Sequence, residues 1–479
     1  MRKKMKNWMT SLTSHYEKMR TTYPQEKLLI VFDIDGTILD TRHLVLYALR
    51  SFDKNHKTSY FKGTRIADID FHEDRLTLLL ERLKIPIKDR PFIMRKYEEL
   101  LFSSTSIIEA HQPFRGVLEV IRWFQLQPST FVGLNTGRPE SLRFNTLQSL
   151  NKLGTGHRVV FRDDLLYMKR PEGGIDIPQI KAQGIEYFRD LGFRVFAVID
   201  NEPENLNAVS KVDWENEILI LHADTIFISK GEDMPGHAIR GKDYNITRLV
   251  SQKSIPAHIQ FIWYCDNTRK NFDTFIRSNI QWVEIDLRGF SLIMQKPGRD
   301  DNMFNINECL NLVKRHNKSI KLDLHGGGIL LGRIIDMIND YNIDSSHLCF
   351  QGSAVVLGEN GFRVLHMLYP DAILQCPIDF LAPMIDETPE QVERMLLTFQ
   401  SWGIKRFSIN WSTPLSRNLF NHVRKWGFMA DLSNITNLAS FLRAALLLPD
   451  SITSHFNYPA WICKEDKQTG TEMEFRRIA

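Results

Sequence analysis

A run of five apolar residues, Leu28–Phe32, is followed at once by Asp33, Asp35, Gly36 and Thr37. An uninterrupted apolar run of this kind is typical of a strand that is buried on both faces of a parallel sheet. The carboxylates then fall where the strand ends, which is the edge at which open α/β sheets bind their ligands. Gly36 allows a turn that brings backbone N–H groups close to an anion. The stretch therefore predicts an α/β sheet that delivers two carboxylates to a ligand site.

Two aspartates at this spacing suit nucleophilic phosphoryl transfer. One carboxylate can attack phosphorus, and the other can protonate the leaving oxygen and later activate water. Because like charges this close repel one another, a divalent cation is needed, and hard oxygen ligands favour Mg²⁺. The plainer alternative is a helix-capping Asp beside a turn Gly. The whole stretch resembles the first motif of the haloacid dehalogenase (HAD) superfamily, which implies Asp33 as nucleophile and Asp35 as general acid/base, both at the metal.

Composition limits the classes of protein to which the chain can belong. A chain of 479 residues, 43% apolar, predicts two or three domains with real cores. With 61 basic and 57 acidic residues, it argues against nucleic acid or an anionic membrane as partner. Five scattered cysteines without CxxC spacing indicate reduced thiols and a cytoplasmic location. No apolar run approaches the length of a membrane span. Residues 1–22 are basic without an apolar core, which predicts a solvated helical arm.

The first domain is predicted to cover residues 23–229. Residues 41–112 contain three stretches with helical spacing of apolar side chains. A helical insertion directly after the first strand resembles the small cap domain of many HAD enzymes, which implies a cap that excludes water and selects the substrate. The alternative is an additional helical layer.

Two further motifs concern the phosphoryl group and its charge. The strand Phe131–Leu134 ends in Asn135–Arg138, which resembles the second HAD motif and implies Thr136 as the phosphate-binding residue. A cation beside the nucleophile would offset the charge of two carboxylates and a phosphoryl group. Lys181, at the start of a predicted helix 181–190, is the preferred candidate, and Lys169 is the alternative.

The strand Arg194–Ile199 ends in Asp200, and the helix after it begins near Glu204. This resembles the fourth HAD motif, which implies Asp200 as the residue that completes the Mg²⁺ site and Glu204 as a supporting group. Asn201 replaces the second aspartate of the usual pair. A last strand, Ile218–Ala223, is expected to close the sheet.

Residues 230–256 are polar and rich in Gly and Pro, which predicts a linker. Beyond them, residues 257–466 alternate between strand and helix patterns about eight times, which predicts a (β/α)₈ TIM barrel with its active face at the carboxyl ends of the strands. Residues 467–479 are expected to be a tail. The predicted strands are Phe261–Cys265, Trp282–Leu287, Ile320–Leu324, Leu348–Gln351, Arg363–Met367, Ala372–Cys376, Arg406–Trp411 and Phe428–Leu432.

Carboxylates gather at two of these strand ends. Strand alternation places Glu284 and Asp286 on one side of the second strand, facing the barrel mouth, and Asp323 and His325 end the third strand with the same spacing. Glu284, Asp286 and Asp323 are therefore candidate ligands for Ca²⁺ or Mg²⁺, with His325 as a further polar group. Helix caps and loop charges are the alternative interpretation.

Val283–Leu287 resembles the Glu-x-Asp motif of glycerophosphodiester phosphodiesterases and of menorin-type barrels, and Pro449–Pro459 resembles the last strand of that family. Two positions depart from the family. Where its enzymes carry catalytic histidines, this chain has Tyr264–Asp266 and Met294–Pro297. Since Gln295 cannot exchange a proton, the barrel is expected to bind a metal or phosphodiester without efficient cleavage, or to use His325 in another arrangement.

The sequence thus predicts a Mg²⁺-dependent HAD-type phosphatase that acts on a small phosphomonoester through an aspartyl-phosphate, fused to a phosphodiesterase-like barrel. Two alternatives for the barrel stay open. It is either a non-catalytic module that localises or regulates the phosphatase, or the first enzyme of a relay that releases a phosphomonoester for the first domain.

Overall fold

The structure is a computed structural model, and it describes residues 7–70, 75–101, 103–169, 176–225, 234–249, 255–265, 268–287 and 306–455. The chain divides into two compact units, residues 1–250 (unit 1) and residues 251–479 (unit 2). No helix in the described part of the chain is both long and apolar enough to cross a membrane.

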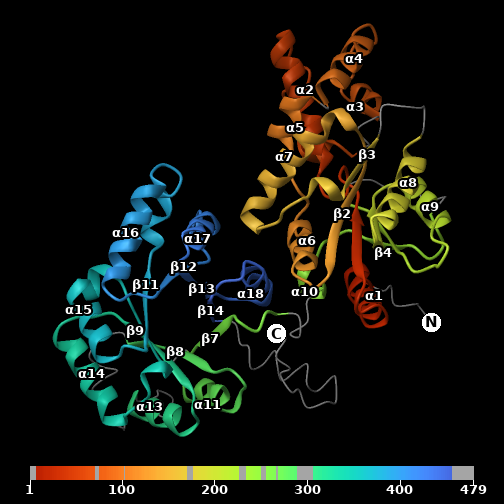
Figure 1. The fold of residues 1–479 in the computed structure, drawn as a ribbon. Helices are drawn as coiled ribbons and strands as arrows, with labels where there is room; N and C mark the ends of the chain where they lie inside the picture. Colours follow the sequence, from red (N-terminus) through yellow and green to blue (C-terminus); the bar gives the residue numbers. More distant parts are fainter. Residues whose placement is uncertain are drawn as a thin grey trace. The chain divides into compact units, whose positions relative to one another are not determined.

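Unit 1 is built on a six-stranded parallel sheet in the order β3-β2-β1-β4-β5-β6 (Figure 1). The apolar run that precedes Asp33 forms β1, near the middle of the sheet, and Leu28–Phe32 are fully buried. The predicted parallel α/β sheet is therefore confirmed. Its strands are β1 (Lys27–Phe32), β2 (Thr130–Pro139), β3 (Leu166–Lys169), β4 (Phe193–Asp200), β5 (Leu219–Ala223) and β6 (Ile239–Gly241).

Helices cover the sheet and form a separate insertion. Between β1 and β2 the chain makes a group of helices with its own apolar core, in which Leu49, Phe52 and Leu79 are buried. These helices are α2 (Thr41–His56), α3 (Leu76–Arg82), α4 (Arg90–Leu101) and α5 (Ser104–Ala110). The remaining helices of unit 1 are α1 (Trp8–Thr22), α6 (Val117–Gln125), α7 (Arg143–Gly154), α8 (Ile177–Asp190), α9 (Pro203–Lys211) and α10 (Ile246–Leu249).

The expectation of a solvated amino-terminal arm is wrong. Helix α1 buries its apolar face, and the Tyr16 hydroxyl lies 2.9 Å from Thr130 Oγ1 of β2. The Trp8 indole N–H donates to the Asp243 carbonyl at 2.7 Å. The segment carries positive charges, but it also has a stripe of apolar residues at helical spacing. This stripe packs the helix against the rest of unit 1.

The predicted linker, residues 230–256, is also wrong where the structure describes it. Residues 234–249 belong to unit 1, where β6 adds an edge strand beyond β5, so that Ile218–Ala223 does not close the sheet. The Tyr244 hydroxyl donates at 2.9 Å to the carbonyl of Thr37, which follows Asp33 and Asp35 in the chain. Gly and Pro in this segment mark turns around a short strand rather than a flexible connection.

Unit 2 contains a closed barrel of eight parallel strands, β7 to β14 in chain order, as predicted (Figure 1). The strands are β7 (Gln260–Tyr264), β8 (Trp282–Leu287), β9 (Ser319–Leu324), β10 (Leu348–Gly352), β11 (Ile373–Pro377), β12 (Arg406–Asn410), β13 (Met429–Ile435) and β14 (Ser451–Ser454). Its main helices are α11 (Arg269–Arg277), α13 (Ile306–Arg315), α14 (Ile329–Tyr341), α15 (Ala354–Leu368), α16 (Pro389–Ser401), α17 (Ser416–Lys425) and α18 (Leu438–Ala445).

One predicted barrel strand is wrong. Residues 363–367, predicted as a strand, belong to α15, in which Phe362 and Leu365 are buried at helical spacing. The eighth strand is instead β14, which lies inside the segment Pro449–Pro459 and pairs with both β13 and β7. The expected tail 467–479 lies outside the described residues.

Candidate functional site

The first site forms where β1, β2 and β4 end on the same edge of the sheet. The Asp33 backbone N–H donates to the Ile199 carbonyl at 2.9 Å, which ties the end of β1 to the end of β4. Gly36 has φ +78°, and an added Cβ would lie 2.5 Å from Asn201 Nδ2. The turn after β1 therefore requires glycine at this position.

Lys181 lies at the centre of this site. Its Nζ is 2.5 Å from Asp33 Oδ1 and 2.9 Å from Asp200 Oδ2, and it donates to the Asn135 carbonyl at 2.6 Å. Helix α8 begins at Ile177, a turn earlier than expected, so Lys181 comes from its second turn. Lys169 ends β3, half-buried, and makes no described contact with these carboxylates. Of the two candidate lysines, the structure brings Lys181 to Asp33.

Asp200 is held by its own neighbours in sequence. Its Oδ1 accepts from the Glu202 backbone N–H at 2.8 Å and from Asn205 Nδ2 at 3.0 Å. Glu204, which was expected to support Asp200, is exposed on α9. The helix turn thus directs Asn205 inward, and the supporting residue was predicted one position too early.

Asp35 is paired with an arginine that was not predicted. Arg138 Nε donates to Asp35 Oδ2 at 2.7 Å, and Arg138 Nη2 donates to Oδ1 at 2.6 Å. The same guanidinium donates to Thr146 Oγ1 at 3.2 Å and lies 3.0 Å from His111 Nε2. Arg138 is the last residue of the motif Asn135–Arg138, but nothing in the sequence shows which carboxylate it contacts.

Thr136 is buried on β2 beside this pair. Its hydroxyl accepts from the Arg138 backbone N–H at 3.2 Å, which leaves the hydroxyl proton available for an anion. Asn135 cross-links β2 and α8, since its Nδ2 donates to the Lys181 carbonyl at 2.8 Å. Its Oδ1 is buried without a hydrogen-bond partner.

The electrostatics of this site show a shortage of positive charge. Burial, and then the carboxylates of Asp200 and Asp35, raise the pKa of Asp33 to about 8 although Lys181 lowers it. Burial alone would lower the pKa of Lys181, but Asp200 and Asp33 raise it to about 12. Burial also opposes ionisation of Asp35, yet Arg138 brings the pKa of Asp35 below its ordinary value. Three carboxylates thus share two buried cations, a donor set of hard oxygens that fits one divalent metal ion.

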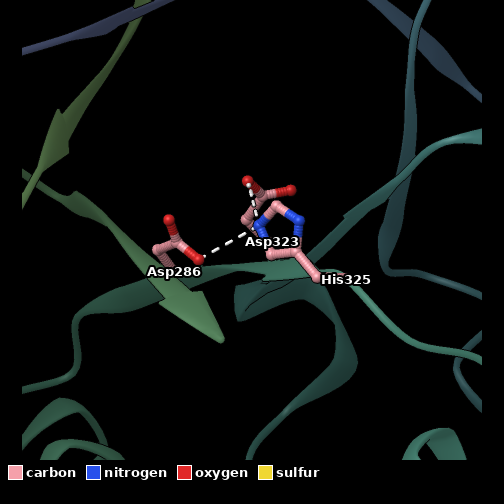
Figure 2. Close-up of side chains that lie close together, drawn as sticks. All are labelled: Asp286, Asp323 and His325. Carbon is pink, nitrogen blue, oxygen red and sulfur yellow. Dashed lines mark ion pairs between the residues drawn. The ribbon is translucent and has the colours of Figure 1, made fainter. Parts of the chain in front are cut away.

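The second site lies at the mouth of the barrel, and Figure 2 shows its three side chains. His325 Nε2 is 3.0 Å from Asp286 Oδ1 and 3.2 Å from Asp323 Oδ2. One ligand atom from each of these residues lies within 4.8 Å of the others. The two carboxylates come from the ends of the paired strands β8 and β9, and His325 directly follows β9. The group can therefore hold a metal ion.

Glu284, predicted as a ligand, does not join this group. Its Oε2 is 2.9 Å from Lys321 Nζ, inside the barrel, and Lys321 Nζ also lies 3.8 Å from Asp431 Oδ2. Burial raises the pKa of Glu284 although Lys321 lowers it. Strand alternation predicts Glu284 on the inner side of the barrel wall. There its carboxylate pairs with the buried Lys321 of the next strand and is not available to the metal-ligand group.

Comparison with known proteins finds no matching family model and no similar curated protein. Similar solved structures cover just under half of this chain. A glycerophosphodiester phosphodiesterase from Parabacteroides distasonis is 9% identical, covers 45% of this chain and 100% of its own, and has a TM-score of 0.32. A phosphodiesterase from Oleispira antarctica in complex with sn-glycerol-3-phosphate is 12% identical, covers 44% of this chain and 97% of its own, and has a TM-score of 0.33.

A hydrolase of the haloacid dehalogenase-like family from Streptococcus pneumoniae is 14% identical, covers 45% of this chain and 93% of its own, and has a TM-score of 0.30. Structures similar to the chain thus include both glycerophosphodiester phosphodiesterases and HAD-like phosphatases. With identities and TM-scores this low, the functional conclusions below rest on the side chains of the two sites.

Proposed function

We propose that unit 1 is a phosphatase that transfers the phosphoryl group of a small phosphomonoester to Asp33 and then to water. The observation that carries this proposal is the contact of Asp33 with Lys181, which also contacts Asp200. A carboxylate at the end of a central strand, with a buried ammonium group beside it, can attack phosphorus while the added charge is offset.

The other residues of the site have roles that follow from their contacts. The Thr136 hydroxyl donates its free proton to a phosphoryl oxygen, since its oxygen already accepts from Arg138. Lys181 is fixed by Asn135 and stabilises negative charge on the nucleophile and on the transferred group. Asp35 exchanges the proton of the leaving oxygen and of the attacking water once its carboxylate leaves the Arg138 pair.

Asp33, Asp35 and Asp200 would hold a Mg²⁺ ion, because they present hard oxygens and exceed the positive charge beside them. When bound, the ion supplies charge neutralisation for the phosphoryl oxygens. The helices α2 to α5 would act as the cap that excludes water and selects the substrate, a role that their place between β1 and β2 supports.

The experiment measures phosphate release from a panel of small phosphomonoesters by the full chain, with and without Mg²⁺. Asp33→Asn is expected to abolish release while the thermal unfolding profile stays cooperative, and Asp35→Asn to do nearly as much damage. Glu204→Gln is the matched control, since this exposed carboxylate lies on α9 near Asp200. Near-parental turnover by Asp33→Asn would refute the proposed nucleophile.

A second function is favoured by the group Asp286, Asp323 and His325. Two carboxylates and an imidazole within reach of one ion would hold Mg²⁺ or Ca²⁺ at the barrel mouth, and the bound ion would attract an anionic ester. Together with the Glu-x-Asp resemblance, this supports a phosphodiester as the ligand of unit 2. Cleavage of that diester would yield a phosphomonoester of the class that unit 1 consumes.

A further inference from the structure

Two aromatic side chains contact each other at the ends of β7 and β14, the two strands that precede β8 around the barrel wall. Tyr264 is the last residue of β7 and His455 directly follows β14, and their ring centroids are 4.1 Å apart with a tilt of 40° between the ring planes. Strand β14 pairs with β7, and β7 pairs with β8, which carries Asp286. The rings therefore come from the first and second strands beside β8 on the barrel wall.

Both rings come from positions that face the inside of the barrel. Ser451 and Thr453 of β14 donate to Asp431 in the interior, so the residue two positions further, His455, lies on the same side. The His455 backbone N–H donates to the Ile435 carbonyl at 2.8 Å, which continues the strand pairing to this residue. Tyr264 is in register with Glu284, whose side chain reaches the interior lysine Lys321.

We propose that His455 is the acid that protonates the leaving oxygen of a phosphodiester bound at Asp286, Asp323 and His325, and that Tyr264 is a positioning residue for its imidazole. The inference rests on the metal site proposed above for unit 2. It adds catalysis, and a catalytic residue, to a site that the sequence predicted to be inefficient.

The spacing of the strands supports this division of roles. Neighbouring strands are about 4.8 Å apart, so side chains from β14 and β8, with β7 between them, start about 10 Å apart across the sheet. His455 is not among the residues whose ligand atoms lie within 4.8 Å of one another at this site. The metal-ligand group would hold the phosphoryl oxygens of a diester, and His455 would protonate its ester oxygen.

The other candidate acids at the mouth are already engaged. His325 directs the same Nε2 to both Asp286 and Asp323. Asp379 Oδ1 accepts from the Asn410 backbone N–H at 2.8 Å and from Thr413 Oγ1 at 3.0 Å. Among the described residues at the carboxyl ends of the eight strands, His455 is the histidine that lies outside the metal-ligand group.

The proposed step balances as a hydrolysis. Water attacks phosphorus, and the bond from phosphorus to the leaving oxygen breaks with its electron pair on that oxygen. The imidazolium N–H of His455 gives its proton to this oxygen, which departs as an alcohol. The attacking water loses a proton to solvent, from which His455 is protonated again. One water is consumed, and the products are a phosphomonoester and an alcohol.

The test uses the full chain with Asp33→Asn, so that unit 1 does not consume the product. Hydrolysis of glycerophosphocholine, whose leaving group is an alkoxide, is compared with that of bis(p-nitrophenyl) phosphate, whose leaving group needs no proton. Each is measured with Mg²⁺, Mn²⁺ and Ca²⁺. His455→Gln is expected to lower kcat about 100-fold or more on the first diester and less than about 10-fold on the second.

Three further variants separate chemistry from structure. Tyr264→Phe retains the ring and is expected to keep near-parental rates, whereas Tyr264→Ala lowers the rate on glycerophosphocholine about 10-fold or more. His316→Gln, at an exposed position after α13, is the matched control and leaves both rates unchanged. Calorimetric affinity for the metal alone is expected to stay the same in His455→Gln.

Equal losses on the two diesters, or no loss, would overturn the assignment of His455. Failure of the chain to hydrolyse either diester with any of the three cations would overturn it as well. Neither of these results contradicts the phosphatase proposal, provided that the parent chain releases phosphate in a reaction that requires Asp33. Loss of metal affinity in His455→Gln would make His455 a ligand and would also contradict the proposed role.

Discussion

Arg138 donates two parallel hydrogen bonds, of 2.7 and 2.6 Å, to Asp35, although 103 residues separate them in the chain. The arginine side chain is 2% exposed. Breaking a buried ion pair by removal of one partner leaves an uncompensated charge, which costs more than the pair itself contributes. This pair therefore makes the stability of unit 1 depend on a residue of the proposed active site.

Arg138→Met is expected to lower the free energy of unfolding by about 3–5 kcal/mol, because the Asp35 carboxylate stays buried without its partner. The double variant Arg138→Met with Asp35→Asn is expected to recover a large part of that loss. Denaturant unfolding of the two single variants and the double variant measures this coupling. Arg143→Gln, an arginine that pairs with Glu140 at the surface, is the control, with a loss of about 1 kcal/mol or less. Additive effects of the two substitutions would contradict the coupling.

Lys181 and Lys169 give a matched comparison of two lysines in one unit. Lys181→Ala removes the ammonium group beside Asp33 and Asp200, and it is expected to lower kcat for phosphate release about 100-fold or more. Lys169→Ala is expected to remain within a few-fold of the parent, because its side chain makes no described contact with the carboxylates. Steady-state kinetics on one phosphomonoester decides between them. The reverse ranking would transfer the role to Lys169.

His111 predicts a pH dependence of stability. Burial, and then Arg138, lower the pKa of His111 from 6.5 to about 3. Below about pH 6.5 the unfolded chain binds a proton at this histidine and the folded chain does not, so folding loses about 1.4 kcal/mol per pH unit until the pH nears the folded pKa. The difference in unfolding free energy between the parent and His111→Gln should therefore shrink as the pH falls from 7 to about 4.5. A difference that is constant with pH would contradict this account of His111.

Metal binding by the barrel distinguishes Glu284 from the proposed ligands Asp286 and Asp323. In a full chain that carries Asp33→Asn and Asp200→Asn, calorimetry with Mg²⁺ and Ca²⁺ reports on unit 2. Asp286→Asn and Asp323→Asn are each expected to weaken binding about 10-fold or more, because each removes one of three ligands. Glu284→Gln is expected to retain the affinity but to lower stability, since Lys321 loses its closest carboxylate. Loss of binding in Glu284→Gln alone would restore the ligand set that the sequence predicted.

The sequence predicted the architecture and the residues that follow strands, because these depend on local patterns. Asp33, Thr136 and Asp200 each sit at or near the end of a strand of the parallel sheet, as the apolar runs before them indicated. The pairs Arg138–Asp35 and Lys321–Glu284 were not predictable in this way. Each joins side chains whose direction depends on packing across the sheet or the barrel.

Predictions from local patterns were also wrong where the composition of a segment is compatible with two different structures. The stretch 363–367 is short and mostly apolar, as a strand can be, yet Leu365 packs from a helix because the neighbouring turns supply the rest of its apolar face. Helix α1 is basic overall and still buries Trp8, Met9 and Leu12. Charge and short local patterns describe what a segment can expose, whereas packing against a partner decides what it buries.

The central claim is that phosphoryl transfer passes through Asp33. The most direct measurement mixes the full chain with acetyl phosphate and Mg²⁺, quenches with acid during turnover, and locates the added phosphoryl group by peptide mass spectrometry. The account predicts an acid-stable, hydroxylamine-sensitive phosphoryl group on Asp33, which accumulates further in Asp35→Asn and is absent from Asp33→Asn. Turnover without any labelled Asp33, or a label on another residue that persists in Asp33→Asn, would contradict it.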